Sequence, residues 1–192
     1  MSKKIFLCTF AFICLALISC NPTSSSTSTA ITVSKLKIND GDVSGWTVSQ
    51  SGIYNSADDW AKPAGGGVDG TAYEYTTTPG LSFTQVLDEK MTNSSGASVT
   101  IYVIDYSTAA NATAMYNYKK STSNWTQNKV VFDTYSDTVA VGCNSSAPNI
   151  SACAHFKQFY IELGFEGETD ITVAQNSAVI FLGIFETKIS GN

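Results

Sequence analysis

The chain has 192 residues and a formal net charge of −5, and its 11 basic residues are all Lys. An acidic chain without Arg is a poor nucleic-acid binder, because phosphate contacts and base recognition depend on clustered Lys and Arg. Its single histidine, His155, excludes a multi-histidine metal site and a catalytic pair of histidines. We therefore expect no nucleic-acid partner and no cofactor.

The first 19 residues have the pattern of an export signal. Lys3 and Lys4 provide a positive start, and the apolar run from Ile5 to Ile18 follows. As a helix this run is about 21 Å long, which is too short for a hydrocarbon core of about 30 Å. We therefore predict a signal segment at 1–19.

The residues that end this segment decide what kind of signal it is. Leu17-Ile18-Ser19-Cys20 resembles the lipobox of bacterial lipoproteins: a branched apolar residue, a tolerant position, a small residue and a Cys. In that family the Cys receives a diacylglycerol group, the chain is cut just before it, and the new amino terminus is usually acylated. The resemblance implies that Cys20 is the lipidated first residue of the mature protein. An ordinary signal peptide cut near Ser19 is the alternative.

The residue after the Cys bears on where such a protein resides. Asn21 stands where Asp marks inner-membrane retention in enteric-type bacteria. The resemblance therefore implies a lipid-anchored protein of the bacterial cell envelope, at the outer membrane rather than the inner one.

A polar tether is predicted at 20–30, followed by one globular domain at 31–192. Residues 21–30 include seven Ser or Thr and no apolar residue before Ala30, so they cannot bury a core. Ten such residues have a mean reach of about 18 Å. From Ile31 onward apolar and aromatic residues return at regular spacing.

The periodicity of the domain predicts strands and helices in an irregular order. We expect a helix capped by Ser107 and ending near Lys120, a second helix at 171–188, and strands at 46–54, 81–91, 98–106, 129–133, 137–143 and 153–165. This order is typical of an α+β domain with a mainly antiparallel sheet packed with helices, an α/β/α-like sandwich.

A weaker resemblance covers about residues 45–185. The stretches Gly45-Trp46, Val68-Asp69-Gly70-Thr71-Ala72-Tyr73-Glu74-Tyr75 and Val103-Ile104-Asp105-Tyr106, followed by an Ala-rich helix ending at Met115-Tyr116, are similar to exported bacterial domains of unknown function with a PsbP/Mog1-like fold. The resemblance implies a fold and carries no catalytic residues.

Two cysteines remain after the leader and the lipid site. Cys143 and Cys153 are an even pair in an exported protein, which predicts a disulfide. The bridge would close a hairpin loop and contribute about 2.7 kcal/mol in the chain-entropy model. Two buried free thiols are the alternative, and a metal pair is disfavoured because a closed site needs four ligands.

Few residues in the domain have the spacing of a known chemistry. Asp40, Asp42 and Ser44 match the first half of a calcium loop, but Ser51 stands where a bidentate Glu should close it, so an Asp/Gly turn explains them as well. The glycine-rich segment 65–70 lacks the Lys-Ser/Thr ending of a phosphate loop and is expected to be a surface loop. We expect His155 to be structural.

We therefore predict no catalytic residue and no metal ligand beyond the weak calcium candidate. The first hypothesis is a non-enzymatic domain, attached to the membrane by its lipid, that binds a glycan or an envelope protein. The alternatives are an envelope hydrolase with carboxylate chemistry and a structural or assembly accessory protein. A polar cleft with converging carboxylates would favour the enzyme, and a flat apolar patch would favour the accessory role.

Overall fold

The structure is a computed structural model that describes residues 31–61, 74–76, 80–121, 139–144, 149–168 and 170–191. The leader 1–19, Cys20 and the tether lie outside these residues. The predicted strand at 129–133 and the glycine-rich segment 65–70 lie outside them as well.

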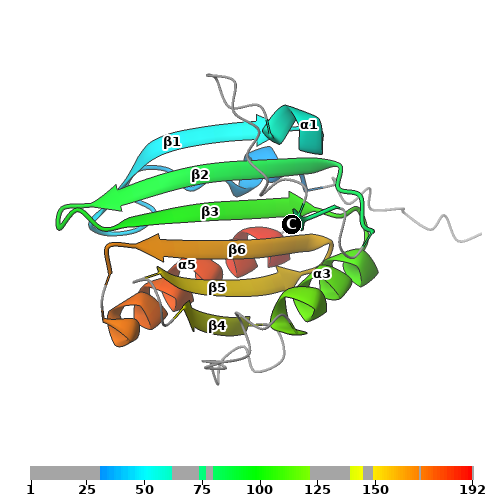
Figure 1. Cartoon of the computed structure of the whole chain (residues 1–192). Helices are drawn as coiled ribbons and strands as arrows, with labels where there is room; N and C mark the ends of the chain where they lie inside the picture. Colours follow the sequence, from blue (N-terminus) through cyan, green and yellow to red (C-terminus); the bar gives the residue numbers. More distant parts are fainter. Residues whose placement is uncertain are drawn as a thin grey trace, which may run out of the picture.

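Within the described residues, six strands form one sheet in the order β1-β2-β3-β6-β5-β4, and every neighbouring pair is antiparallel (Figure 1). The strands are β1 (Trp46–Tyr54), β2 (Gln85–Asn93), β3 (Ser98–Asp105), β4 (Val139–Asn144), β5 (Asn149–Phe156) and β6 (Phe159–Glu166). The sequence prediction for β1 is confirmed at both ends, and β2 and β3 lie close to their predicted positions.

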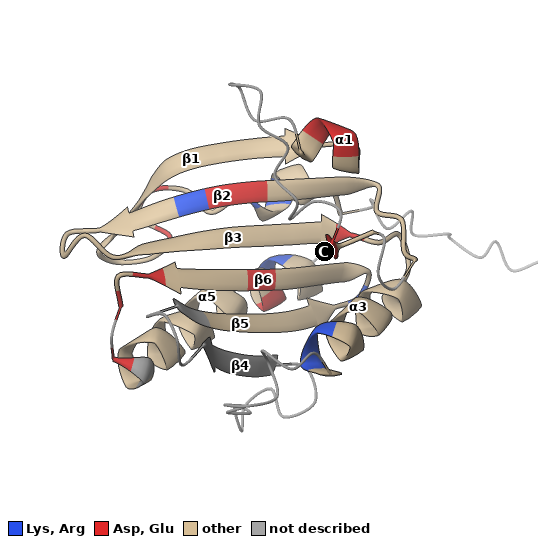
Figure 2. Cartoon of the chain, in the orientation of Figure 1, with Lys and Arg blue, Asp and Glu red and all other residues tan. Residues whose placement is uncertain are grey.

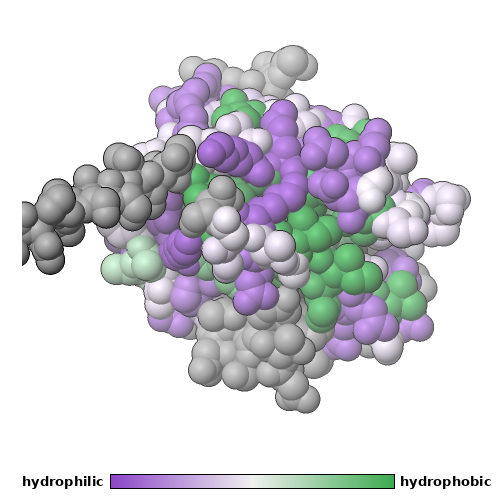
Figure 3. Space-filling model, turned by 180° about the vertical axis from the view of Figure 1, so that it is seen from behind, coloured by the Kyte–Doolittle hydropathy of each residue, from purple (hydrophilic) through white to green (hydrophobic). Residues whose placement is uncertain are grey.

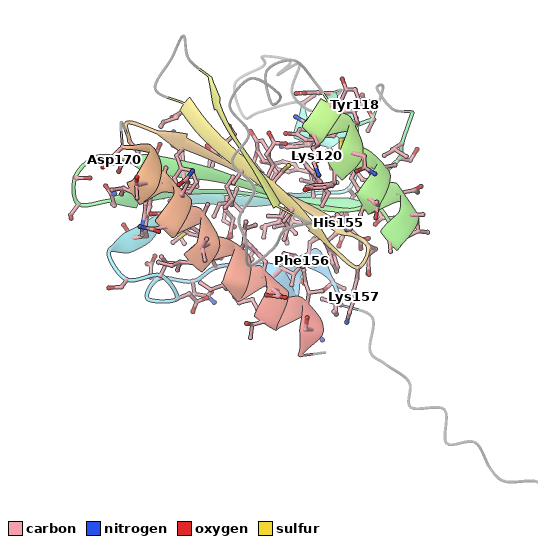
Figure 4. The ribbon with its side chains drawn as sticks, turned by 90° about the horizontal axis from the view of Figure 1, so that it is seen from below. Tyr118, Lys120, His155, Phe156, Lys157 and Asp170 are labelled. Atoms are coloured by element: carbon pink, nitrogen blue, oxygen red, sulfur yellow. The ribbon has the colours of Figure 1, made fainter. Side chains whose placement is uncertain are left out.

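Helical segments cover both faces of the sheet. One face packs against α5 (Ile171–Ser190) and the 3-10 helix η1 (Val33–Leu36). The other face packs against α1 (Ala57–Trp60) and α3 (Ala109–Ser121). Figure 4 shows α3 and α5 on opposite sides of β5. The predicted α+β class with three layers is confirmed.

The central strand β3 explains why the sheet can be buried on both sides. It consists largely of Val, Ile and Tyr, which favour extended backbone. Val99, Ile101 and Val103 lie in the core beneath α5, and Ile104 lies in the core beneath α3. Each face of this strand therefore contributes to a separate apolar layer.

The prediction of a single strand at 153–165 is wrong. The chain reverses at Lys157 and Gln158, and Phe156 pairs with Phe159 across this two-residue turn. Lys157 adopts a positive φ of 51°, although such turns usually contain Gly or Asn. The sequence does not predict this hairpin, because Lys157-Gln158 lacks the Asn or Gly that two-residue turns favour.

The helices begin at side-chain caps. The predicted cap of α3 is displaced by one residue, because the Thr108 hydroxyl accepts from Asn111 N at 3.2 Å while Ser107 has a φ of 63°. The Asp170 carboxylate caps α5 by accepting from Thr172 N at 2.8 Å. The predicted C-terminal helix is confirmed. None of the helices in the described residues has the length and apolarity needed to cross a membrane.

Candidate functional site

A polar hollow of about 180 Å³ lies beside α3 on the outer face of strands β3, β5 and β6. It is lined by Thr100, Tyr102, Ser151, Glu162, Gly164, Phe165 and Glu166. Sites for drug-sized molecules measure about 300–1,000 Å³. The hollow therefore fits a small ligand or one unit of a longer one.

The floor of the hollow is a row of small residues that crosses neighbouring strands. The register places Gly164 of β6 opposite Thr100 of β3 on one side and opposite Ser151 of β5 on the other. Strands lie about 4.8 Å apart, so this row spans about 10 Å. A Cβ atom added at Gly164 would meet no atom within 4 Å. The missing side chain at this position leaves open space above the sheet.

Aromatic rings form one wall. Tyr102 is half-buried and packs edge to face against Trp60, with ring centroids 5.0 Å apart, and against Tyr75 at 5.8 Å. The indole Nε1 of Trp60 donates to Asp88 Oδ2 at 2.8 Å, which fixes the Trp60 ring. Tyr102 is thus held in place by its neighbours while it lines the hollow.

A buried ionic cluster lies behind this wall. Lys119 of α3 is only 3 % exposed, and its Nζ contacts Glu74 Oε1 at 2.8 Å and Glu162 Oε2 at 3.2 Å. Burial lowers the pKa of Lys119, but the charges of Glu162 and Glu74 outweigh burial, and the pKa is raised overall. Lys119 therefore stays positive and neutralises the carboxylate at the inner end of the hollow.

Two buried tyrosines complete this cluster. The Tyr160 hydroxyl donates to Glu162 Oε2 at 2.7 Å, and Lys119 Nζ lies 4.5 Å from the centroid of the Tyr75 ring. Burial, together with the nearby carboxylates, raises the pKa of Tyr75 and of Tyr160 well above the ordinary value. Both hydroxyls keep their protons over the physiological range.

An ion pair that is more exposed than the Lys119 cluster lies at the opposite rim of the hollow. Lys90 Nζ of β2 lies 3.2 Å from Glu166 Oε2 of β6, and the Ser98 hydroxyl donates to the same oxygen at 3.3 Å. Figure 2 shows the charged segments of β2 and β6 on either side of β3. Each of the two carboxylates that line the hollow therefore has its own lysine.

Comparisons with known proteins give no name to this site. No protein-family model matches the chain, and neither a curated protein nor a solved structure is a significant match. Its chemistry follows from its own residues: an aromatic ring, two hydroxyls, and carboxylates that accept hydrogen bonds while their charges are balanced.

The calcium candidate has a structural role in the loop before β1. Asp40 Oδ1 accepts from Val48 N at 2.7 Å, and Asp42 Oδ2 accepts from Asn39 N at 3.0 Å and pairs with Lys188 at 3.1 Å. Backbone hydrogen bonds and Lys188 lower the pKa of Asp42. Ser44 is exposed on the same turn. In the part of the chain that the structure describes, no group of three His, Cys, Asp or Glu residues could hold a metal ion.

The two domain cysteines lie on neighbouring strands but not opposite each other. Cys143 pairs with Ile150, and Cys153 pairs with Ala140, so they are three positions apart along the β4–β5 ladder. A disulfide needs Cα atoms about 4.4–6.8 Å apart, which this register does not provide. Cys153 is buried, and the side chain of Cys143 lies outside the described residues. The disulfide stays a prediction, and it requires a shift in this ladder.

His155 lies at the end of β5, beside α3 (Figure 4). Its ring is 5.1 Å from that of Tyr116, and burial lowers its pKa. It pairs with Tyr160 across the sheet and is not among the residues that line the hollow. This position fits the structural role that the sequence indicates.

The hollow itself is missed by sequence reasoning. Its main polar residues alternate along β6, where Tyr160, Glu162, Gly164 and Glu166 share one face and Phe159, Ile161, Leu163 and Phe165 share the other. The alternation is present in the sequence, but the residues that it brings together depend on the pairing of β6 with β3 and β5. Lys119 is missed because a basic residue in the last turn of a helix is normally solvated.

Proposed function

We propose that this chain is a lipid-anchored lipoprotein of the bacterial cell envelope, held at the outer membrane through Cys20, whose domain binds a ligand and is not an enzyme. The lipobox residues Leu17-Ile18-Ser19-Cys20 and the polar tether support the anchor. The hollow beside α3 supports ligand binding, because it is the place where an aromatic ring and several polar side chains converge.

The lysine partners of Glu162 and Glu166 are the observation that favours ligand binding over hydrolysis. Glu162 and Glu166 are four residues apart on one strand, so their Cα atoms are about 13 Å apart. Glu162 is turned to Lys119, and Glu166 is turned to Lys90. Glycoside hydrolases turn two carboxyl groups toward one scissile bond from opposite sides, whereas these two side chains are turned toward different lysines. The arrangement in the hollow favours acceptance of hydrogen bonds over paired acid and base chemistry.

The ligand that fits this chemistry best is an unmodified saccharide. The Tyr102 ring offers an apolar surface for a sugar ring, and Thr100, Ser151 and Glu162 offer partners for its hydroxyl groups. A strongly anionic ligand is disfavoured, because the hollow contains two carboxylates and no uncompensated lysine among its lining residues. We therefore propose a glycan-binding role.

The resemblance to PsbP/Mog1-like domains also stays a proposal. It predicts helices on both faces of an antiparallel sheet, and this chain has such an arrangement. Many unrelated functions occur on one fold, so this support concerns architecture alone.

The anchor is tested by replacing Cys20. The Cys20→Ala chain and the wild type are expressed in a bacterial host with a radiolabelled fatty acid and then fractionated. We expect label and membrane association in the wild type and neither in Cys20→Ala, because the acyl chains hold the protein. Cys14→Ala, a change in the apolar run, is the matched control and should behave as the wild type. Equal membrane association of the Cys20→Ala chain would refute the anchor.

The hollow is tested by filling it. Gly164→Val places a side chain in the open space above the floor and removes no contact, so folding should be retained. We expect at least a tenfold loss of affinity for whichever probe the wild type binds among glucose, N-acetylglucosamine and chitotriose, measured by titration calorimetry. Thr92→Val on β2, outside the lining of the hollow, is the control. Binding that survives Gly164→Val, or no binding of any probe by the wild type, would refute the saccharide proposal.

A further inference from the structure

Helix α5 has a second apolar stripe that faces away from the core. Its buried side is formed by Ala174, Ala178, Phe181, Leu182, Phe185 and Ile189. Val173 and Ile180, two turns apart on the opposite side, are 46 % and 53 % exposed. A shallow groove along the helix is lined by Val179, Ile180, Gly183, Ile184 and Thr187, and by the ion pair of Asp42 with Lys188. Figure 3 shows an apolar patch on this face of the molecule.

Helix α5 itself places no carboxylate on the stripe, and Asp42, which also lines the groove, is paired with Lys188 at 3.1 Å. Between Val173 and Thr187, this side of the helix holds Asn176, Ser177, Ile180 and Gly183, and Ile184 at its margin is partly buried against the core. Glu186, the acidic residue within the helix, lies about 120° around the axis from Ile180. Lys188 closes the stripe at its C-terminal end and is partly exposed. Apolar side chains exposed along one side of a helix can be buried in the headgroup region of a lipid surface.

The chain enters the domain on the same side of the sheet. Ile31, the first described residue, packs in the core cluster that contains α5, together with Val33 and Leu36 of η1. Lys188 of α5 also donates to the Lys37 carbonyl. The segment that leads from Cys20 to the domain is therefore attached to the α5 layer, and the sheet separates this layer from α3 and the hollow.

The length of that segment limits how the domain can sit. The polar composition of residues 21–30 predicts a mean reach of about 18 Å. The packed layers are about 10 Å apart. A chain that enters on the α5 side can therefore reach the face with α3 only by passing around the edge of the sheet. A bilayer that holds Cys20 is therefore nearest to η1 and α5.

We propose that the outward stripe of α5 rests on the phospholipid surface to which Cys20 anchors the chain, with the hollow facing away from the bilayer. This placement depends on the proposed lipid anchor. It leaves the hollow beside α3 open to soluble or polymeric ligands on the far side of the sheet.

Photocross-linking to lipid tests this placement. The full-length lipidated chain is reconstituted in vesicles of phosphatidylethanolamine and phosphatidylglycerol, with p-benzoylphenylalanine in place of Ile180 or, as the control, of Gln50. Gln50 is exposed on β1 and shares the face of the hollow, because it lies in one cross-strand row with Lys90 and Thr100. We expect at least fivefold more phospholipid adduct from position 180 than from position 50.

The outcomes separate this inference from the anchor. If the lipidated chain leaves the vesicle fraction as the Cys20→Ala chain does, both proposals fail. If it stays on the vesicles but position 50 yields as much lipid adduct as position 180, only the placement fails. Cross-links from position 180 to a second copy of the chain, in place of lipid, would assign the stripe to a dimer and would also overturn the placement.

A second experiment changes Ile180 itself and moves the photoreactive residue to Val173. Ile180→Asn makes the centre of the stripe polar, and Ile180 is largely exposed, so the fold should persist by far-UV circular dichroism. With the probe at Val173, we expect a threefold or greater loss of lipid adduct while the protein stays on the vesicles. Unchanged labelling would refute a role for the stripe.

Discussion

Lys119 holds two acidic residues from distant parts of the chain. Its ammonium group is buried between Glu74 and Glu162, and Glu162 also accepts from Tyr160. Replacement of one member of a buried ion pair leaves the other charge uncompensated, which costs about 3–5 kcal/mol. The same residue thus stabilises the fold and sets the charge at the inner end of the hollow.

We predict that Lys119→Met lowers the free energy of unfolding by about 3 kcal/mol, measured by urea denaturation. Lys120→Met is the matched control, because Lys120 is only half-buried and its Nζ lies over the Tyr116 ring at 5.4 Å, a contact that contributes about 0.5–2 kcal/mol. Similar losses in the two variants would contradict the prediction.

Glu89 is a carboxylate buried on the α5 side of the sheet. It is 1 % exposed, and it accepts from Ile38 N at 3.0 Å and from the Ser51 hydroxyl at 2.9 Å. Burial raises the pKa of Glu89, and the two hydrogen bonds offset this only in part. The folded chain therefore retains this proton at a pH where the unfolded chain has already lost it.

This shift predicts how stability depends on pH. Below about pH 4.5 both states hold the proton, and the contribution of Glu89 to stability is fully present. As pH rises, the unfolded chain releases its proton first, and the contribution is lost as pH passes the raised pKa of the folded state. We predict that the stability of the wild type relative to Glu89→Gln falls between pH 4 and pH 8. A difference that is constant or grows over this range would contradict the assignment.

At the scale of elements, the turn of the β5–β6 hairpin places a residue with a side chain in an unfavourable backbone conformation. Lys157 has a φ of 51°, which a residue with a Cβ adopts at a cost of about 1–2 kcal/mol. Its Nζ donates to the Ile189 carbonyl of α5 at 2.8 Å, which offsets part of that cost. The hairpin therefore depends on a contact with another layer.

Two substitutions at Lys157 separate these effects. Lys157→Ala removes the contact with Ile189 and keeps the unfavourable φ, whereas Lys157→Gly removes both. We predict that the glycine variant is more stable than the alanine variant by about 1 kcal/mol in urea denaturation. An alanine variant that is equally or more stable would show that the turn is relaxed.

The register of the β4–β5 ladder decides whether Cys143 and Cys153 can form a disulfide, and this can be tested. In the ladder as it stands, Cys143 and Cys153 are three positions apart. We predict that, if the bridge forms in the exported protein, alkylation of the denatured protein without reductant modifies neither thiol. The bridge would also require the β4–β5 ladder to be shifted. Two alkylated thiols in the intact mass would refute the bridge and agree with the present register.

The elements that the sequence predicts have a local signal, whereas the features that it misses depend on packing and strand pairing. β1 is predicted from Trp46, Val48 and Ile53, and α5 from its length and its closing Gly191, although Val179-Ile180-Phe181 favours a strand. The hairpin at Lys157 is hidden because its turn residues carry no backbone preference, and packing imposes the turn. The hollow is harder still, because Thr100, Gly164 and Ser151 meet only through the register of three strands. Residue alternation predicts a polar face, but not which residues lie side by side on it.

At the scale of the whole molecule, the segment before β1 closes the α5 side of the core. Val33, Leu36, Ile38 and Val43 are each at most 3 % exposed. Burial of such side chains contributes about 1.5–3 kcal/mol each, against a total stability of about 5–15 kcal/mol for a domain. We predict that residues 31–192 unfold at the same urea concentration as the chain from Cys20, whereas residues 46–192 show no cooperative transition. A cooperative transition of the shorter chain would contradict this role.

The order of the strands also has a consequence for how the chain reaches its native state. β1, β2 and β3 form one meander of neighbouring strands, and β4, β5 and β6 form another, and the two are joined by the pairing of β3 with β6. The β2–β3, β4–β5 and β5–β6 connections close short loops, which is fast, whereas 30 residues separate β1 from β2 and more than 50 separate β3 from β6. We therefore expect the joining of β3 to β6 to limit the folding rate. An exported chain would pass through this step outside the cytoplasm, with two half-sheets whose inner edges are still unpaired.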